Sequence, residues 1–181
     1  PEESRSGSAP HGDVVVAGVE ADQEVEHAAQ GGDVAVIEVD RELGLERTAA
    51  TLQGVPTNYH TDQLFPIVKA AAEVCGVKYE LDSDIGRRLR RITDHVRACT
   101  FAVHENVYPG ANKEKYVVKR LLRRAVLDGH QMGMRDPFLH KIVPAVVAAM
   151  KQPYPDLVET QQRVASVIEK EEANFFGTID A

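Results

Sequence analysis

Residues 116–126 separate cationic from apolar side chains with the period of an α-helix. At about 100° per residue, the apolar members fall on one half of a helical wheel: Val117, Val118, Leu121, Leu122, Ala125 and Val126. The cations share the other half: Lys119, Arg120, Arg123 and Arg124. The spacing predicts a helix with a side that faces a core and a strip of four positive charges, so the rest of the chain must supply helices that cover the apolar side.

The strip of cations has two interpretations that the helix alone leaves open. Like charges at i and i+4 repel one another by a few tenths of a kcal/mol, which favours a surface selected to bind an anion such as a phosphate backbone. Alternatively, lysine and arginine serve solubility and helix propensity on a solvated face.

The distribution of charge supports the first interpretation. The chain has a formal net charge of −7, but residues 1–40 hold ten acids and one base, whereas residues 87–124 hold eleven bases and three acids. The positive surface is therefore local, and a concentrated patch on an acidic protein is typical of a specific polyanion site.

Length and composition narrow the class of protein. A chain of 181 residues can form one domain with a core, or a smaller domain and a tail. Cys75 and Cys99 each lie in an apolar helical pattern without a CxxC spacing, so we expect two reduced core cysteines and no metal site. No apolar run approaches the ~20 residues of a membrane span. The first residues lack the basic segment followed by an apolar segment that is typical of a signal peptide. These features predict a cytoplasmic protein that binds neither membrane nor DNA.

The composition changes near residue 40 and divides the chain into three parts. Residues 1–33 are acidic and rich in small side chains, which predicts an irregular or disordered tail. Residues 34–56 contain the best strand candidate, residues 34–39, and a short helix from residue 43 to 52 that ends before Gly54 and Pro56. Residues 57–181 have helical periodicity almost throughout, so the predicted fold class is mainly α: a helical bundle after a short β segment.

Four further helices are expected in the third part. Thr61 is the predicted cap of one that ends at Gly76, and apolar residues at intervals of three or four predict a helix of about 20 residues from Ile85 to Val103. Residues 128–130 should end the basic helix. Pro144 should kink a buried helix over residues 138–150. The last helix follows Pro155.

Three acids of the last helix lie close together near the end of the sequence. Glu169, Glu171 and Glu172 are expected on a solvated face. Because no helix terminator precedes Ala181, the sequence suggests a piece of a longer protein.

Six blocks, in order, resemble the alanyl-tRNA synthetase family: residues 44–47, 57–62, 93–97, 116–126, 137–144 and 169–172. The resemblance covers about residues 40–181. It implies the end of a class II catalytic domain, where residues 40–47 correspond to motif 3, followed by the helical middle domain that binds the tRNA acceptor stem and recognises its G·U wobble pair.

The resemblance also implies roles for particular residues. Gly44 and Arg47 would belong to the ATP site, with Arg47 on the triphosphate and Mg²⁺ accompanying ATP in the full-length enzyme. Asn112 would be the asparagine that recognises the wobble pair, because an amide offers both donor and acceptor to base edges in the minor groove of A-form RNA; a turn residue after Pro-Gly is the equally weighted alternative. The remaining tRNA-binding candidates are cations: Arg97, Lys113, Lys119, Arg120, Arg123 and Arg124.

The sequence departs from the family at its N-terminal side. Arg41 and Glu42 replace a threonine and a glycine of motif 3, and residues 1–38 do not resemble the catalytic strands expected there, which suggests a reading-frame artefact. Class II motifs 1 and 2 and the zinc-bearing editing module are not found, so no complete catalytic set is expected in these 181 residues.

Two functions from different classes are therefore considered. The chain is part of an alanine–tRNA ligase that binds the tRNA(Ala) acceptor stem for ATP-dependent attachment of alanine, or it is a stand-alone helical RNA-binding module without catalytic activity.

Overall fold

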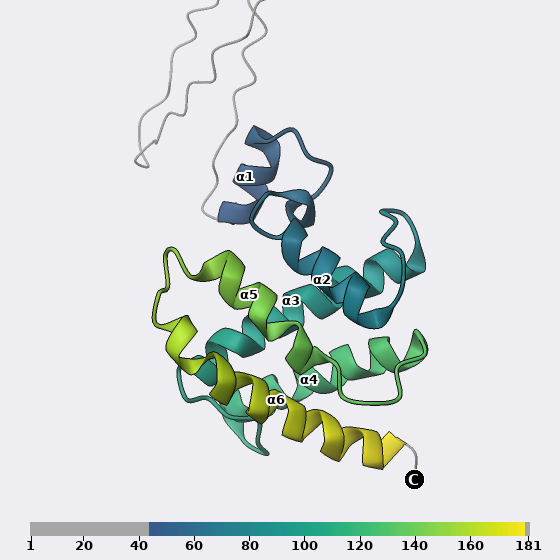
Figure 1. The fold of residues 1–181 in the computed structure, drawn as a ribbon, viewed down its shortest axis with the longest axis vertical. Coiled ribbons are helices and arrows are strands. Elements are labelled where there is room, and N and C mark those ends of the chain that lie inside the picture. Colours follow the sequence, from purple (N-terminus) through teal and green to yellow (C-terminus); the bar gives the residue numbers. More distant parts are fainter. Residues whose placement is uncertain (1–43, 180–181) are drawn as a thin grey trace, which may run out of the picture. The chain divides into compact units, whose positions relative to one another are not determined.

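The computed structural model describes residues 44–179, which form six α-helices and two short 3-10 helices (Figure 1). The part of the chain that it describes contains no strand, which confirms the prediction of a mainly α protein. The strand predicted for residues 34–39 and the tail predicted for residues 1–33 lie outside the described residues. None of the helices within 44–179 is long and apolar enough to cross a membrane.

The elements follow one another along the chain without long loops. The α-helices are α1 (Leu45–Leu52), α2 (Phe65–Cys75), α3 (Asp84–His104), α4 (Lys113–Gln131), α5 (Val143–Met150) and α6 (Leu157–Ile179). The 3-10 helices are η1 (Asn58–His60) and η2 (Leu139–Lys141).

Helix α3 is at the centre of the core and contacts α2, α4, α5 and α6 (Figure 1). Its N-terminus is capped by Ser83, whose Oγ accepts a hydrogen bond of 2.8 Å from the backbone N–H of Gly86. Most of the predicted apolar stripe is confirmed, since Leu89, Ile92, Val96 and Val103 are fully buried, but its first member, Ile85, is 39% exposed, so its predicted place was wrong. Burial of one such aliphatic side chain contributes about 1.5–3 kcal/mol, and the 3.6-residue period places them all on one side of the helix.

The two cysteines are buried and unbonded, as predicted. Burial raises the pKa of Cys75 to about 11 and that of Cys99 to about 12. Both thiols therefore stay protonated and act as small apolar core groups.

Helix α4 buries most of the predicted apolar side. Val118, Leu122, Ala125 and Val126 are buried, but Val117 is 53% exposed, so its predicted place on the core side was wrong. Val117 precedes Val118 by one residue, and a rotation of about 100° turns it away from the core.

Helix α4 does not break at residues 128–130 as predicted but continues to Gln131. Gly129 is buried beneath the Phe138 ring, and a Cβ atom added there would lie 2.1 Å from Phe138 Cζ. The glycine therefore provides room for close packing, and contacts with Phe138 outweigh its low helix propensity.

Two further predictions, the kink at Pro144 and the cap at Thr61, were wrong. Pro144 lies in the first turn of α5, where its missing N–H leaves no hydrogen bond unmade, and it makes no kink. The N-cap of α2 is Leu64 rather than Thr61, although Thr61 Oγ1 accepts a hydrogen bond of 3.4 Å from Leu64 N–H. The predicted end of α2 is confirmed at Gly76, which has a φ of 65°.

Glu172 of α6 is fully buried, which contradicts its predicted place on a solvated face. Its carboxylate accepts hydrogen bonds from the backbone N–H groups of Phe138 (2.8 Å), Leu139 (2.8 Å) and His140 (3.1 Å). Burial raises the pKa of this carboxyl despite the three donors. The side chain thereby joins α6 to the start of η2.

Candidate nucleic-acid interface

A cationic pocket lies at the N-terminal half of α4. It has a volume of about 330 Å³. The residues that line it come from the turn before α4 and from α4 itself: Gly110, Ala111, Tyr116, Lys119, Arg120 and Arg123. Three of the four cations predicted from the sequence thus share one pocket, and Arg124, which is exposed, lies one residue beyond it on the same helix.

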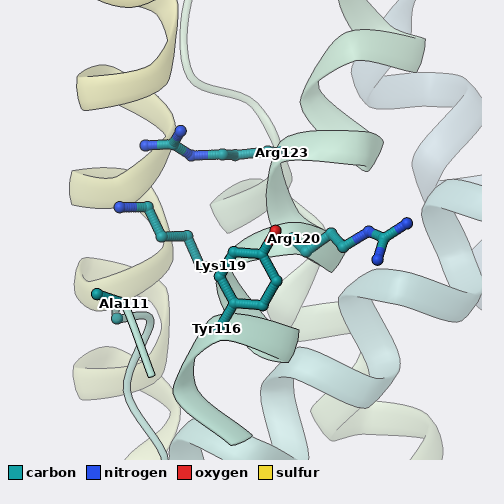
Figure 2. Close-up of a pocket in the computed structure, with 6 residues that line it drawn as sticks. Ala111, Tyr116, Lys119, Arg120 and Arg123 are labelled. Carbon is teal, nitrogen blue, oxygen red and sulfur yellow. The ribbon is translucent and has the colours of Figure 1, made fainter. Parts of the chain in front are cut away.

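The cations of α4 extend in two directions from the helix. Figure 2 shows Lys119 and Arg123 reaching toward α6, whereas Arg120 extends to the opposite side of Tyr116. Lys119 and Arg123 are half-buried, and Arg120 and Arg124 are exposed. This division follows from the helix period, because each pair is separated by four residues and therefore shares a face.

Tyr116 lies between the two directions of charge and is 52% exposed (Figure 2). An aromatic ring that borders a cationic pocket provides a flat apolar surface beside the charges, which suits contact with a sugar or a base.

The turn before α4 presents Asn112 to solvent. Asn112 is the N-cap residue of α4, yet its side chain makes no capping hydrogen bond. The turn is closed instead by a hydrogen bond of 3.0 Å that Gly110 N–H donates to the carbonyl of Lys115. The amide of Asn112 is exposed, so its donor and acceptor atoms point to water rather than to the helix end.

Helix α6 holds the loop that leads to this turn. Arg163 donates hydrogen bonds to the carbonyl of His104 (3.0 Å), to Tyr108 Oη (2.6 Å) and to Asn106 Oδ1. A fourth hydrogen bond of 2.8 Å joins His104 Nδ1 to Thr160 Oγ1. The position of the turn therefore depends on side chains that are more than 50 residues away in the sequence.

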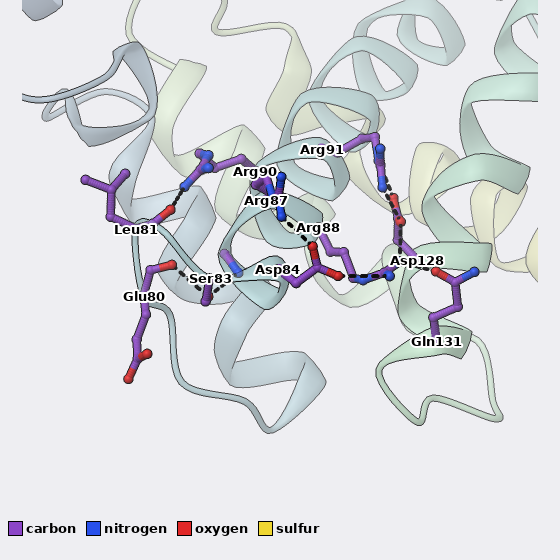
Figure 3. A network of polar contacts seen from close by, with 11 residues as sticks. Glu80, Leu81, Ser83, Asp84, Arg87, Arg88, Arg90, Arg91, Asp128 and Gln131 are labelled. Atoms are coloured by element: carbon purple, nitrogen blue, oxygen red, sulfur yellow. Dashed lines mark hydrogen bonds and ion pairs between the residues drawn. The ribbon is translucent and has the colours of Figure 1, made fainter.

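The arginines of α3, which the charge count of residues 87–124 included in the positive surface, pair with groups of the fold instead (Figure 3). Arg91 donates two hydrogen bonds of 2.6 Å to Asp128, and Arg88 donates one of 3.1 Å to the same carboxylate. Asp128 raises the pKa of the Arg91 guanidinium through the hydrogen bonds. The side chain of Asp128 is only 5% exposed, so it forms a buried ionic link between α3 and α4.

The other arginines of α3 also have partners. Arg87 pairs with Asp84 at 2.7 Å, and Arg90 donates to the carbonyl of Leu81 at 2.8 Å (Figure 3). Arg90 also donates to Tyr79 Oη at 2.9 Å. The eleven bases of residues 87–124 therefore do not form one patch, because those of α3 neutralise acids or fix loops.

Arg97, predicted to bind tRNA, does not line the pocket but pairs with Glu46 of α1 at 2.8 Å. This hydrogen bond lowers the pKa of Glu46. The predicted ATP-site residues Gly44 and Arg47 are both exposed, at the start of α1. The structure places Asn112 at the N-cap of α4 and Lys119, Arg120, Arg123 and Arg124 along that helix, whereas Arg97 belongs to α3 and Arg47 to α1.

Sequence reasoning missed two contributors on α6. Glu171 accepts a hydrogen bond of 2.9 Å from Arg123 Nε, and Phe175 places its ring centroid 4.9 Å from Arg123 Cζ. Their spacing of four residues puts them on one face of α6, but nothing local indicates that this face meets α4. Within residues 44–179, no group of three or more histidine, cysteine or acidic side chains could hold a metal ion.

Comparison with known proteins gives one consistent result. A family model described as "tRNA synthetases class II (A)" matches residues 13–181. This match starts at residue 13, whereas the resemblance described from the sequence starts at about residue 40.

Three relatives are alanine–tRNA ligases. The chain is 66% identical over 142 residues to that of Rhodopirellula baltica, an alignment that covers 78% of this chain and 15% of the relative. It is 44% identical over 141 residues to that of Pelotomaculum thermopropionicum, covering 78% and 16%. It is 39% identical over 143 residues to that of Streptococcus mutans, covering 79% and 16%. The chain thus spans about one sixth of the length of these relatives.

Proposed function

Because this chain belongs to the class II alanyl-tRNA synthetase family, we propose that its helical part binds the acceptor stem of tRNA(Ala) for attachment of alanine. The observation that carries the proposal is the pocket that the α4 cations form with Gly110 and Ala111 of the preceding turn. Most other basic side chains of the region are used inside the fold, whereas Lys119 and Arg120 of the pocket make no ion pair within residues 44–179.

The charge of α4 supports binding to a phosphate backbone. Among residues 44–179, no carboxylate pairs with Lys119, Arg120 or Arg124. Unpaired cations at intervals of one helical turn can each neutralise a phosphate and release its counterions. Repulsion among them costs folding free energy in the absence of RNA, and the phosphates of bound RNA offset that repulsion.

Asn112 supplies the means of base recognition in this proposal. The Asn112 amide makes no capping hydrogen bond at the start of α4, and phosphate contacts by that helix would place it against the wide, shallow minor groove of an RNA helix. There the amide can donate to and accept from base edges, whereas the cations contribute affinity without sequence preference. We therefore assign G·U recognition to Asn112 and affinity to Lys113, Lys119, Arg120, Arg123 and Arg124.

The ligase reaction itself is proposed for the whole protein. In that reaction ATP activates alanine before transfer to tRNA, and Gly44 and Arg47 would contribute to the ATP site, since an exposed arginine at a helix start suits a phosphate. The described residues offer no carboxylate cluster for Mg²⁺, so we assign no metal-dependent step to them. A cytoplasmic location stays a prediction.

Binding of an acceptor-stem RNA hairpin tests the proposal. We expect affinity that falls steeply with salt, and replacement of Arg120 and Arg124 by glutamine should lower the slope of log K against log[salt] by about one per lost phosphate contact. Arg87→Gln is the matched control, because Arg87 is an exposed cation paired with Asp84. If the double variant and the control bind alike, α4 does not contact RNA.

Specificity has its own test. Asn112→Ala should reduce the preference for a G·U over a G·C hairpin by roughly tenfold, corresponding to about 1–3 kcal/mol for one base contact, while the salt dependence stays unchanged. If the preference for G·U over G·C is unchanged, Asn112 does not recognise the base pair and serves only as a turn residue.

The alternative, a stand-alone RNA-binding module, predicts the same binding. The two differ in ATP–pyrophosphate exchange with alanine, which the ligase proposal expects from the whole protein and which these 181 residues should not perform alone. Lack of exchange by the whole protein would favour the stand-alone module.

A further inference from the structure

Arg123 differs from the other cations of the pocket because α6 restrains it. Its Nε donates a hydrogen bond of 2.9 Å to Glu171 Oε1, and its guanidinium lies 4.9 Å from the centroid of the Phe175 ring. The Glu171 side chain is only 12% exposed, so this acceptor is itself held in place. Figure 2 shows the Arg123 side chain extended toward α6.

The contact with Glu171 uses only one edge of the guanidinium. Arg123 has five N–H donors, and within residues 44–179 its only hydrogen bond is the one from Nε. The two terminal nitrogens therefore keep the paired N–H groups that bind a phosphate in bidentate geometry. Because Arg123 lines the pocket, this free fork is available to a ligand there.

The restraint has a consequence for binding. A free arginine loses much rotamer freedom when it binds a phosphate, and a planar guanidinium already held by a carboxylate and a ring loses less. Lys119, the neighbouring cation that also extends toward α6, has no ion pair among the described residues and would bind as a mobile point charge.

We infer that Glu171 and Phe175 are positioning residues, which hold Arg123 with its terminal nitrogens toward a phosphate of the bound RNA. The inference rests on the proposed function. It assigns to Glu171 a favourable role in binding a polyanion, although the residue is itself negatively charged.

That sign makes the inference testable. If Glu171 acted only through its charge, both Glu171→Ala and Glu171→Gln would strengthen RNA binding, since each removes a negative group from the pocket. If Glu171 positions Arg123, the two variants separate: glutamine can still accept from Nε through its amide oxygen, whereas alanine cannot.

The experiment measures affinity for the acceptor-stem hairpin across a salt series, with thermal unfolding of each variant as a check of folding. We expect Glu171→Ala to weaken binding about three- to tenfold and to lower the salt slope by about one, while Glu171→Gln binds within about twofold of the unmodified protein. Phe175→Leu should give a smaller loss. In an Arg123→Gln background, Glu171→Ala should cause no further loss.

Binding by Glu171→Ala that is unchanged or tighter would overturn the inference. Should this variant unfold, Glu171→Asp replaces it, because the shorter side chain withdraws the carboxylate from Nε, and the same comparison with Glu171→Gln applies. The proposed function fails separately, when Arg120→Gln with Arg124→Gln leaves binding unchanged. Loss of binding in that double variant without loss in Glu171→Ala refutes the positioning role alone.

Discussion

Replacement of Asp128 by asparagine tests the structural role that we assign to the arginines of α3. The Asp128 carboxylate is 5% exposed and accepts three hydrogen bonds from Arg88 and Arg91. Removing one partner of a buried ion pair costs about 3–5 kcal/mol. The two arginine side chains are 24% and 39% exposed, so their charges regain some hydration, and we expect a smaller loss of about 2–4 kcal/mol.

Urea denaturation followed by the helical circular dichroism signal measures this loss. Asp84→Asn is the matched control, because Asp84 pairs with Arg87 and Arg88 but is 67% exposed. The exposed pair should contribute less than about 1 kcal/mol, and its contribution should vanish in high salt, whereas that of the buried pair should persist. If Asp128→Asn costs no more than Asp84→Asn, the buried link does not stabilise the fold, and Arg88 and Arg91 become candidates for RNA binding.

Three further predictions concern single positions. Gly129→Ala should destabilise the protein by about 1–3 kcal/mol, although alanine is the better helix former, because the new methyl group overlaps the Phe138 ring. Gly177→Ala is the control, since its methyl group would lie in open space on α6, and it should be neutral or stabilising. Thermal unfolding of both variants measures the difference. Glu172→Ala should cost at least ~3 kcal/mol in urea, because three backbone donors lose their acceptor, and Glu172→Gln should cost less. Glu46→Gln should cost below about 1 kcal/mol. Since pairing lowers the pKa of Glu46 from 4.5, that difference should be present above pH 4.5 and disappear as the pH falls through the lowered value, as urea titrations across pH would detect.

The helices could be predicted because their signals are local. The apolar residues from Leu89 to Val103 recur at intervals of three or four, which predicts the helical period of α3. Gly76, which has a positive φ, is the residue at which α2 ends. Predictions failed where a distant residue decided the outcome. Gly129 belongs to a helix because Phe138 packs against it. Pro144 does not kink a helix because η2 ends at Lys141 and a new helix, α5, begins at Val143.

The candidate site was predicted in part for the same reason. The α4 cations are consecutive on one helix, so the sequence could group Lys119, Arg120, Arg123 and Arg124. It could not show which arginines are already paired, because the partners are far away in the chain: Asp128 lies 40 residues beyond Arg88, and Glu171 lies 48 residues beyond Arg123. Charge counts identify the region of a polyanion site, but only the tertiary contacts identify the side chains that remain available.

The neighbouring acids of α6 illustrate how one short run can serve both stability and binding. A step of one residue rotates the side chain by about 100°, so Glu172 faces the core and the start of η2 while Glu171 faces Arg123 on α4. Glu169 is exposed. The sequence places all three on one solvated face, whereas the fold gives each a different environment. Substitution of Glu172 should therefore change the free energy of unfolding, and substitution of Glu171 should change mainly RNA affinity. Because both carboxylates belong to the same helix, the position of Arg123 in the pocket and the attachment of η2 depend on the same placement of α6.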